Sequence, residues 1–183
     1  MWQLKEPSPV KLIVGILAAD EDALQLAINT LPVHFGPIDL ESNVWRFLHT
    51  HYYKDQTGES ILRQFVSFAQ LIDPGQLAEI KHKTNEIEQT LAKQLKLPVP
   101  RPANLDPGLI ETSKLVLATT KNYAHRIYIG KKMYAEVTLI YDKGKWRTFE
   151  YTYPDYRQKC YHDFFDKVRT RLREQLKSTQ QQS

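Results

Sequence analysis

The sequence has a single cysteine, Cys160, among its 183 residues. One cysteine excludes an intramolecular disulfide and any metal site built from several cysteines, and such scarcity is typical of a reducing compartment. The longest apolar run, Leu12–Ala19, is far too short to span a bilayer, and the segment Met1–Ser8 lacks the features of a signal peptide. We therefore expect a cytoplasmic protein that makes no contact with a membrane.

The short motifs of several common enzyme classes are also missing. No G-x-x-x-x-G-K-[ST] follows a strand, although a P-loop needs those glycines and that lysine to hold phosphates. There is no G-x-S-x-G nucleophile elbow, no RNA-recognition signature and no internal repeat. Thr120-Lys121-Asn122-Tyr123 differs from a guanine-reading TKxD segment, because Tyr123 stands where the aspartate is needed. We do not expect an ordinary GTPase.

The net charge of +4 is concentrated at one end of the chain. Between Arg157 and Lys177 there are seven Lys or Arg against three Asp or Glu, which leaves eighteen of each in the rest. A basic helix can contact nucleic acid through phosphates, but mixed runs such as RTRLRE are also typical of an ordinary solvated face. Because no stacking motif accompanies the charge, nucleic acid stays open as a partner but is the less favoured one.

Hydrophobic patterning predicts the first strand and the first helix. Val10–Ala19 is almost continuously apolar, as expected of a strand that is buried on both faces. Asp20 suits the N-cap of the helix that follows. The apolar positions of that helix are Leu24, Ala27, Ile28 and Leu31.

Two further strands and a long helix follow. Val44–Tyr53 and Ile61–Leu71 are rich in aromatic and β-branched residues, and KDQTGES between them predicts a hairpin loop. Pro74 takes the first position of a helix that begins after Asp73. Its apolar positions recur at spacings of three and four: Leu77, Ile80, Thr84, Ile87, Leu91 and Leu95. Beside them runs a polar strip, Lys81, Asn85 and Glu88, which we interpret as an ordinary solvated face.

These elements predict an α+β fold. A strand between Arg101 and Thr120 would complete a split βαβ, or ferredoxin-like, half with its first two helices on one face. Antiparallel hairpins then extend the sheet, with strands near His125–Ile129, Tyr134–Tyr141 and Lys145–Tyr151 and a turn at DKG. A C-terminal helix buries Tyr161, Phe164, Phe165, Val168 and Leu172. We expect one globular domain over residues 1–177 and a disordered tail over residues 178–183.

The segment KNYAHRIYIGKKMYAEVTL carries many hydrogen-bonding groups for a hairpin. If residues 130–132 form a three-residue loop, Arg126 lies opposite Glu136, and Thr138 follows on the same face. His125 then belongs to the opposite face. A cross-strand Arg–Glu pair is also a common structural device, so the pairing alone does not indicate function.

Neighbouring polar residues turn this hairpin into a candidate site. As catalytic groups we select His125, whose residue type exchanges protons near neutral pH, with Glu136 and Asp155. The ligand-binding candidates are Arg63, Lys121, Arg126, Tyr153 and Arg157. The cationic side chains among them could hold a phosphate or carboxylate. Residues 155–157 are expected to begin the final helix, where unpaired backbone amides would add an anion site. We select no metal ligands, although His49 and His51 share one face of a predicted strand.

Several motifs together give the chain a family resemblance. They are HTHYYKDQTGESILRQFVSF, IKHKTNEIE, NLDPG, TKNYAHRIYIG, YAEVTL and TYPDYR, and they are spread over nearly the whole chain from Lys11 to Arg173. The sequence resembles a prokaryotic family known as domain of unknown function 4416. The resemblance implies no established activity, although some members carry the label GTP-binding protein.

Two hypotheses about function follow. The first is a small-molecule binder, with or without enzymatic activity, whose polar cleft holds an anion such as a nucleotide or a phosphorylated metabolite. The second is a noncatalytic module that binds protein or RNA through its tyrosine-rich segments and basic C-terminal helix. Convergence of the polar side chains on one concave surface would favour the first, and a flat exposed patch would favour the second. The sequence identifies no cofactor, substrate or oligomeric state.

Overall fold

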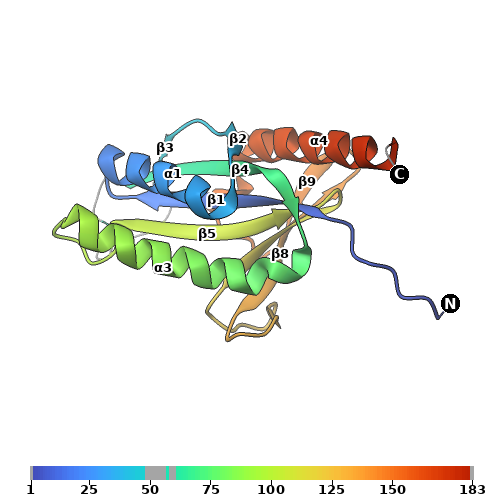
Figure 1. Cartoon of the computed structure of the whole chain (residues 1–183), viewed down its shortest axis with the longest axis horizontal. Coiled ribbons are helices and arrows are strands. Elements are labelled where there is room, and N and C mark those ends of the chain that lie inside the picture. The colour runs from blue at the N-terminus through green and yellow to red at the C-terminus, as the bar shows by residue number, and fades with distance from the viewer. Residues whose placement is uncertain (1, 48–56, 58–60, 182–183) are drawn as a thin grey trace.

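A sheet of nine strands, counted over the described residues, forms the centre of the computed structural model (Figure 1). The structure describes residues 2–47, 57 and 61–181. The strands are β1 (Val10–Ala18), β2 (Ile38–Glu41), β3 (Trp45–Arg46), β4 (Leu62–Ile72), β5 (Ala103–Ile110), β6 (Lys114–Thr119), β7 (Ile127–Tyr128), β8 (Tyr134–Asp142) and β9 (Lys145–Thr148). The α-helices are α1 (Glu21–Phe35), α3 (Leu77–Leu95) and α4 (Lys159–Gln181), and short 3-10 helices are η2 (Pro74–Gln76) and η3 (Asp155–Arg157).

The first half confirms the predicted α+β arrangement. Its strands lie in the order β2-β4-β1-β5, and each neighbouring pair is antiparallel. Strand β1 is therefore parallel to β2 with β4 between them, and β4 is parallel to β5 with β1 between them. These are two interleaved split βαβ units, consistent with a ferredoxin-like half. As predicted, Asp20 caps α1, and its side chain accepts a hydrogen bond from the Ala23 N–H at 2.8 Å.

The second strand of this half is not the one predicted. Residues 38–41, after Gly36-Pro37, pair with β4. In the described part of the predicted strand Val44–Tyr53, which ends at residue 47, Trp45–Arg46 pair with β4 as well. Residues 48–53 and most of the predicted KDQTGES loop lie outside the described residues. Strand β2 was not predicted because its four residues, three half-buried and one exposed, are too few to show a period-2 pattern after a Gly-Pro pair.

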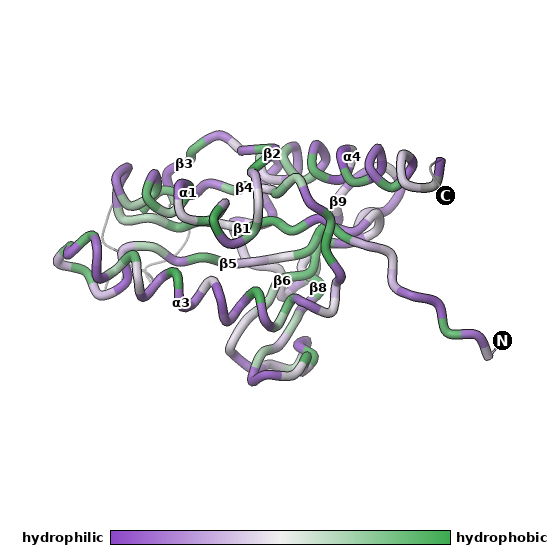
Figure 2. The backbone as a smooth tube through the Cα atoms, in the orientation of Figure 1, coloured by the Kyte–Doolittle hydropathy of each residue, from purple (hydrophilic) through white to green (hydrophobic). Residues whose placement is uncertain are grey.

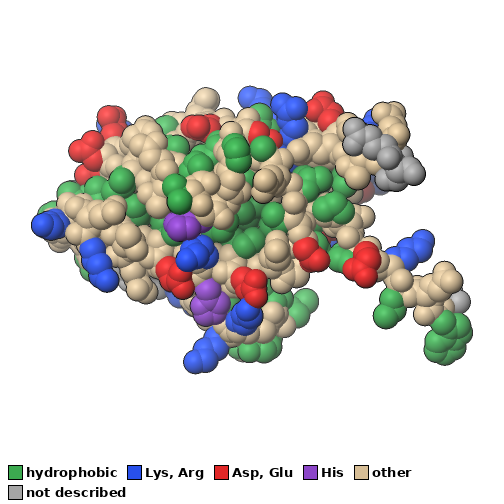
Figure 3. Space-filling model, in the orientation of Figure 1, with side chains coloured by type: hydrophobic (Ala, Val, Ile, Leu, Met, Phe, Trp, Pro, Cys, Tyr) green, Lys and Arg blue, Asp and Glu red, His purple; other side chains and the backbone are tan. Residues whose placement is uncertain are grey.

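The sheet separates two hydrophobic layers. Alternate residues of β1, including Val14 and Ile16, pack under α1 and α3, as the predicted apolar positions of those helices require. On the other face Ile13 and Phe65 pack against the predicted stripe of α4. Figure 2 shows the central strands as mostly hydrophobic, and Figure 3 shows charged side chains of both signs scattered over the face that is in view.

Strands β8, β7 and β9 extend the sheet, as predicted. Strand β6, which joins them to β5, was not predicted, because one strand was expected between Arg101 and Thr120 and the structure has two there. In β7 and β8, Tyr128 lies opposite Tyr134, and the Ile129 N–H donates to the Met133 carbonyl, so residues 130–132 form the expected three-residue loop. This register places Arg126 opposite Glu136. The DKG turn joins β8 to β9, with positive φ at Lys143 and Gly144.

The C-terminal helix differs from its prediction at both ends. Residues 155–157 do not begin it; they form η3, and α4 starts at Lys159. The N–H groups of Arg157 and Gln158 donate to the carbonyls of Pro154 and Asp155, so these two amides are not available for an anion. At its other end α4 continues to Gln181, into the segment expected to form a disordered tail.

Candidate functional site

The candidate site begins at a break in the sheet between β5 and β6. Strand β5 pairs with β1 from Ala103 to Ile110, but it pairs with β6 only from Gly108 to Ile110. The Glu111 N–H donates to a β6 carbonyl, so N–H groups at odd-numbered positions of this strand face β6. Pro107 has no N–H to donate in that direction, and the pairing stops there.

Two side chains of α3 replace the missing backbone partners. The Leu105 N–H donates to Oε1 of Glu88 at 2.7 Å, and Nζ of Lys81 donates to the Leu105 carbonyl at 2.8 Å. Both side chains are buried, although the polar strip of α3 was predicted to be a solvated face, and that prediction is wrong. Burial raises the pKa of Glu88 above its ordinary value, despite the opposing effects of Lys81 and Arg101.

A cavity of about 450 Å³ lies beside this break, within the size range of small-molecule sites. Its walls come from β4, α3, β5, β6, β8, the loop after β6 and the segment that includes η3. Among the described residues its lining includes five cationic side chains and three carboxylates. The cations are Arg63, Lys81, Arg101, Lys121 and Arg126, and the carboxylates are Asp106, Glu136 and Asp155.

Arg63 of β4 is the most deeply buried of these arginines, with 3% of its side chain exposed. Its Nη2 donates to Oδ2 of Asp155 at 2.7 Å, and its Nη1 lies 3.8 Å from Oδ2 of Asp106. Burial by itself would lower the pKa of Arg63, but Asp155 and Asp106 raise it above the ordinary value. Its Nε and Nη1 have no hydrogen-bond partner among the described residues, which is costly for a buried cation.

Aromatic rings and a glycine form the space for this guanidinium. Its central carbon lies 5.1 to 5.6 Å from the ring centroids of Phe47, Phe65 and Tyr156. A Cβ at Gly15 would lie 3.0 Å from Nη1 of Arg63 and 2.9 Å from the Phe65 ring. Any side chain at this position of β1 would therefore displace the arginine or the ring.

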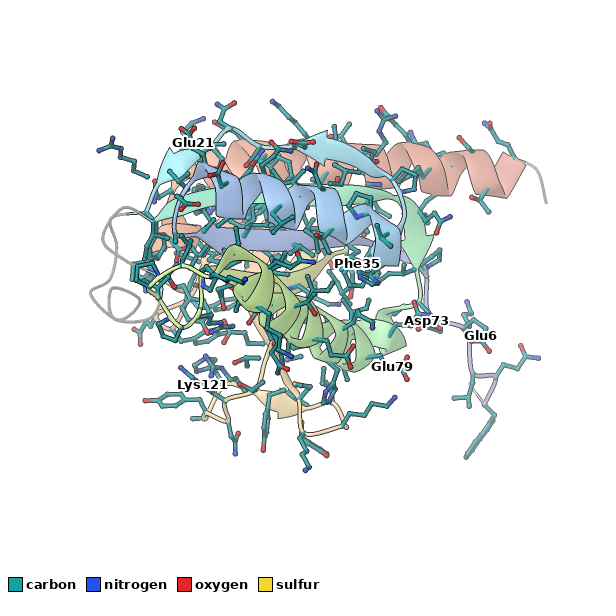
Figure 4. The ribbon with its side chains drawn as sticks, turned by 60° about the vertical axis from the view of Figure 1, so that its left-hand side comes forward. Glu6, Glu21, Phe35, Asp73, Glu79 and Lys121 are labelled. Carbon is teal, nitrogen blue, oxygen red and sulfur yellow. The ribbon has the colours of Figure 1, made fainter. Side chains whose placement is uncertain are left out.

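The second charged group of the cavity is the predicted pair of Arg126 and Glu136. Nε of Arg126 donates to Oε2 of Glu136 at 2.8 Å, Nη1 donates to the Lys121 carbonyl, and Nη2 donates to the Tyr153 hydroxyl at 2.7 Å. Thr138 donates to the other oxygen of Glu136, as its place on the same face predicts. Burial, with a contribution from Glu136, raises the pKa of Tyr153 to about 12. Figure 4 shows Lys121 on the loop that follows β6.

His125 does not lie on the opposite face from Glu136, so this prediction is wrong. Its Nε2 lies 3.2 Å from Oε2 of Glu136, because His125 precedes β7 and does not follow the alternation of a strand. Its ring stacks on Tyr151, with 4.0 Å between centroids and 8° between planes. His125 therefore supports the Arg126–Glu136 pair from outside the cavity lining.

The structure brings most of the predicted site residues together. Arg63, Lys121, Arg126, Glu136, Tyr153 and Asp155 all line the cavity. Arg157 does not: its Nε donates to the Thr152 carbonyl and its Nη2 to the Glu150 carbonyl, so it fixes the chain before η3. The segments that carry the family resemblance include these lining residues and also those of α3 and β5.

Sequence reasoning missed one side of the cavity. Lys81 and Asn85 of α3, Arg101, and Asn104 and Asp106 of β5 line it but were not selected. Their signal was the polar strip beside the apolar stripe of α3, together with the run NLDPG. A polar strip indicates a site only when the strand beside it is known to lack a partner.

The described residues hold no group of three or more His, Cys, Asp or Glu side chains that could bind a metal. His49 and His51, the pair considered for a metal, lie outside the described residues. No helix in the described part of the chain is long and apolar enough to cross a bilayer.

The sequence matches the family described as Domain of unknown function (DUF4416) over residues 8–172. The chain belongs to this family. The match confirms the resemblance found in the sequence and covers all the cavity residues named above. Comparisons with curated proteins and with solved structures gave no significant match.

Proposed function

We propose that this DUF4416 chain binds an anionic small molecule, such as a nucleotide or a phosphorylated metabolite, in the cavity beside the β5–β6 break. One observation carries the proposal: five cationic side chains line a single cavity, and Lys81 and Arg63 among them are almost completely buried. Burying a cation is costly unless its charge is compensated. The three lining carboxylates and Glu88, which pairs with Arg101 from outside the lining, balance four of the five cations. An anionic ligand would compensate the positive charge that remains.

Binding has more support than catalysis by the groups selected from the sequence. Asp155 pairs with Arg63, and Glu136 contacts three polar side chains, so neither carboxylate has the freedom expected of a general base. Enzymatic activity is therefore a subsidiary part of the proposal, and the groups that would perform it would be other residues of the lining.

Isothermal titration of the full chain with inorganic phosphate, nucleotides and phosphorylated metabolites tests the proposal. Arg126→Gln should lower the affinity for the tightest-binding of these ligands about tenfold or more, because a charged hydrogen bond contributes roughly 1.5–3 kcal/mol. Arg147→Gln is the matched control, since Arg147 lies on β9 and pairs with Asp142 away from the cavity. Native mass spectrometry of protein from its own host would identify a retained ligand.

Two results would refute the proposal. The first is a wild-type chain that binds none of these anions, and the second is equal weakening in Arg126→Gln and Arg147→Gln. Each titration should be made well below the thermal midpoint of the variant, because Arg126 and Glu136 are both nearly buried and Arg126→Gln will also reduce stability.

A noncatalytic interaction module is the second candidate. It is favoured by the exposed Tyr123, Ile127 and Tyr128, which lie on and before β7. The basic helix adds less support, because Arg169 is packed over the Tyr141 ring at 3.6 Å and donates to the Thr112 carbonyl. Absence of anion binding by the wild-type chain would favour this candidate.

A further inference from the structure

The three carboxylates that line the cavity differ in how much of each is exposed. The exposed fraction of the side chain is 1% for Glu136, 6% for Asp155 and 26% for Asp106. Asp106 is also the half-buried residue of a strand whose other residues are all buried. Among these three groups, Asp106 is therefore the one that a ligand can reach.

The contacts of the carboxylates differ in the same way. Oε2 of Glu136 accepts from Arg126 and contacts His125, and Oε1 accepts from Thr138. Oδ2 of Asp155 accepts a short hydrogen bond from Arg63. The contacts of Glu136 and the burial of Asp155 leave these two groups little capacity for a ligand.

Asp106 is held in place but is not saturated. Nδ2 of Asn104 donates to its Oδ2 at 2.6 Å, which fixes the side chain beside the cavity. Nζ of Lys81 and Nη1 of Arg63 each lie 3.8 Å from one of its oxygens, beyond hydrogen-bond distance. Oδ1 makes no hydrogen bond within the described part of the chain. One oxygen of a lining carboxylate therefore lacks a donor.

The charges around Asp106 restrict which donor can fill this position. A phosphate placed against the carboxylate would be repelled by it, and a ligand ammonium would be repelled by Lys81 and Arg63. A neutral hydroxyl avoids both repulsions and donates the hydrogen bond that Oδ1 lacks. The same ligand can then place its anionic group against the cations elsewhere in the lining.

We infer that Asp106 accepts a hydrogen bond from a ligand hydroxyl, so that the ligand is a phosphate ester with free hydroxyls, as in sugar phosphates and ribonucleotides. The inference rests on the proposed anion binding. It adds that the ligand also carries a hydroxyl group, which Asp106 recognises. Asp106 provides specificity for the hydroxyl, and the cations provide affinity for the phosphate.

Titration with two phosphate esters of similar size tests the inference. Ribose 5-phosphate carries free hydroxyls and phenyl phosphate has none, so the ratio of their affinities measures the contribution of the hydroxyls. Asp106→Asn should reduce this ratio about tenfold or more relative to wild type, because hydrogen bonds to charged acceptors are the stronger ones. Asp106→Asn should also bind inorganic phosphate several-fold more tightly, since it removes a negative charge beside two cations.

Two controls accompany the measurement. Asp163→Asn removes an exposed carboxylate of α4 that pairs with Lys159, and it should leave the ratio unchanged. Circular dichroism and the thermal midpoint without ligand show whether Asp106→Asn folds, and Asp106→Ser is used if it does not. Adenosine monophosphate is titrated in parallel, and its affinity is also divided by that of phenyl phosphate. If Asp106→Asn lowers this ratio more than the ratio for ribose 5-phosphate, a ribonucleotide is recognised; if it lowers the ratio for ribose 5-phosphate more, a sugar phosphate is recognised.

The outcomes separate this inference from the proposed function. If wild type binds inorganic phosphate but the ratio changes less than twofold in the Asp106 variant, the hydroxyl assignment is overturned and anion binding stands. If Asp106→Asn weakens the binding of inorganic phosphate, ribose 5-phosphate and phenyl phosphate equally, the hydroxyl assignment is also overturned, because Asp106 would then have a structural role. If wild type binds no anion at all, both proposals fail.

Discussion

The two edges of β5 have different partners. Toward β1 the strand makes a continuous antiparallel ladder along its whole length. Toward β6 the ladder covers three residue pairs, and at Leu105 the side chains of Glu88 and Lys81 take the place of a neighbouring strand. One strand therefore has a purely backbone edge and an edge that is completed by charged side chains.

This difference explains how charged groups come to lie inside a sheet. A buried backbone N–H or carbonyl must find a partner, and where the next strand diverges only a side chain can supply it. Glu88 and Lys81 meet that need at Leu105, and Lys81 also lines the cavity. The candidate site is thus a consequence of the broken ladder, and the intact edge holds β5 to β1 along its whole length.

The largest expected effect comes from removing the carboxylate that completes the broken edge. Glu88→Ala leaves the Leu105 N–H without its acceptor and takes the ion pair from Arg101, whose Nη2 lies 2.6 Å from Oε2. We expect a loss of about 3 kcal/mol or more in the free energy of unfolding, as for other broken buried pairs. Urea unfolding followed by circular dichroism measures it.

Glu86→Ala on the same helix is the matched control. Glu86 is exposed and pairs with Lys83, so its removal should change stability far less than the removal of Glu88. Similar losses in the two variants would mean that Glu88 does not support the edge of β5, and the comparison of the two edges would then lose its physical basis.

The role of Glu88 could not be predicted from the sequence. Its position in α3 was predictable, because the apolar stripe fixes which residues flank the buried face. Its burial depends on the divergence of β6 from β5, which is a tertiary feature with no local pattern. The same reason hid Asp106, whose strand was predicted only as lying somewhere between Arg101 and Thr120.

Predictions that rest on local geometry succeeded. The continuous apolar run of β1 predicts a central strand, and a loop of fixed length sets the register that places Arg126 opposite Glu136. Failures occurred where local rules stop applying. His125 precedes the strand whose alternation was extended to it, and β2 is too short to show a period.

A second variant tests the short paired part of the broken edge. A Cβ at Gly108 would lie 2.6 Å from Cδ2 of Leu117 and 2.9 Å from the Val116 carbonyl oxygen of β6. Gly108→Ala should therefore cost about 1–3 kcal/mol of stability, as overpacking does. In a double-mutant cycle with Leu117→Ala the cost should fall only in part, because the Val116 carbonyl cannot be truncated. Full additivity of the two changes would show that β6 does not approach Gly108 this closely.

A third, smaller effect concerns the pH dependence of stability. Because burial raises the pKa of Glu88, the folded chain holds this proton more tightly than the unfolded chain, whose carboxyl titrates near 4.5. Stability from Glu88 is therefore greatest below pH 4.5 and is lost as pH rises through the folded-state pKa. Relative to Glu88→Gln, which does not titrate, wild type should lose stability over this window. If the free energy of unfolding of wild type instead rises relative to that of Glu88→Gln as pH increases, the pKa of Glu88 is not raised in the folded chain.

The smallest expected effect comes from Pro107, and it decides what keeps the two strands apart. Pro107→Ala restores an N–H toward β6, but Glu88 and Lys81 still occupy the edge at Leu105, so we expect β6 to stay separated. The loss of stability should be about 1 kcal/mol, arising from the greater freedom of the unfolded chain and from the new N–H, which lacks a strand partner. In hydrogen exchange the new backbone amide of this variant should exchange rapidly, because it faces the cavity side without a strand partner. Slow exchange together with increased stability would show that proline alone interrupts the ladder, and that the α3 side chains fill a gap they do not maintain.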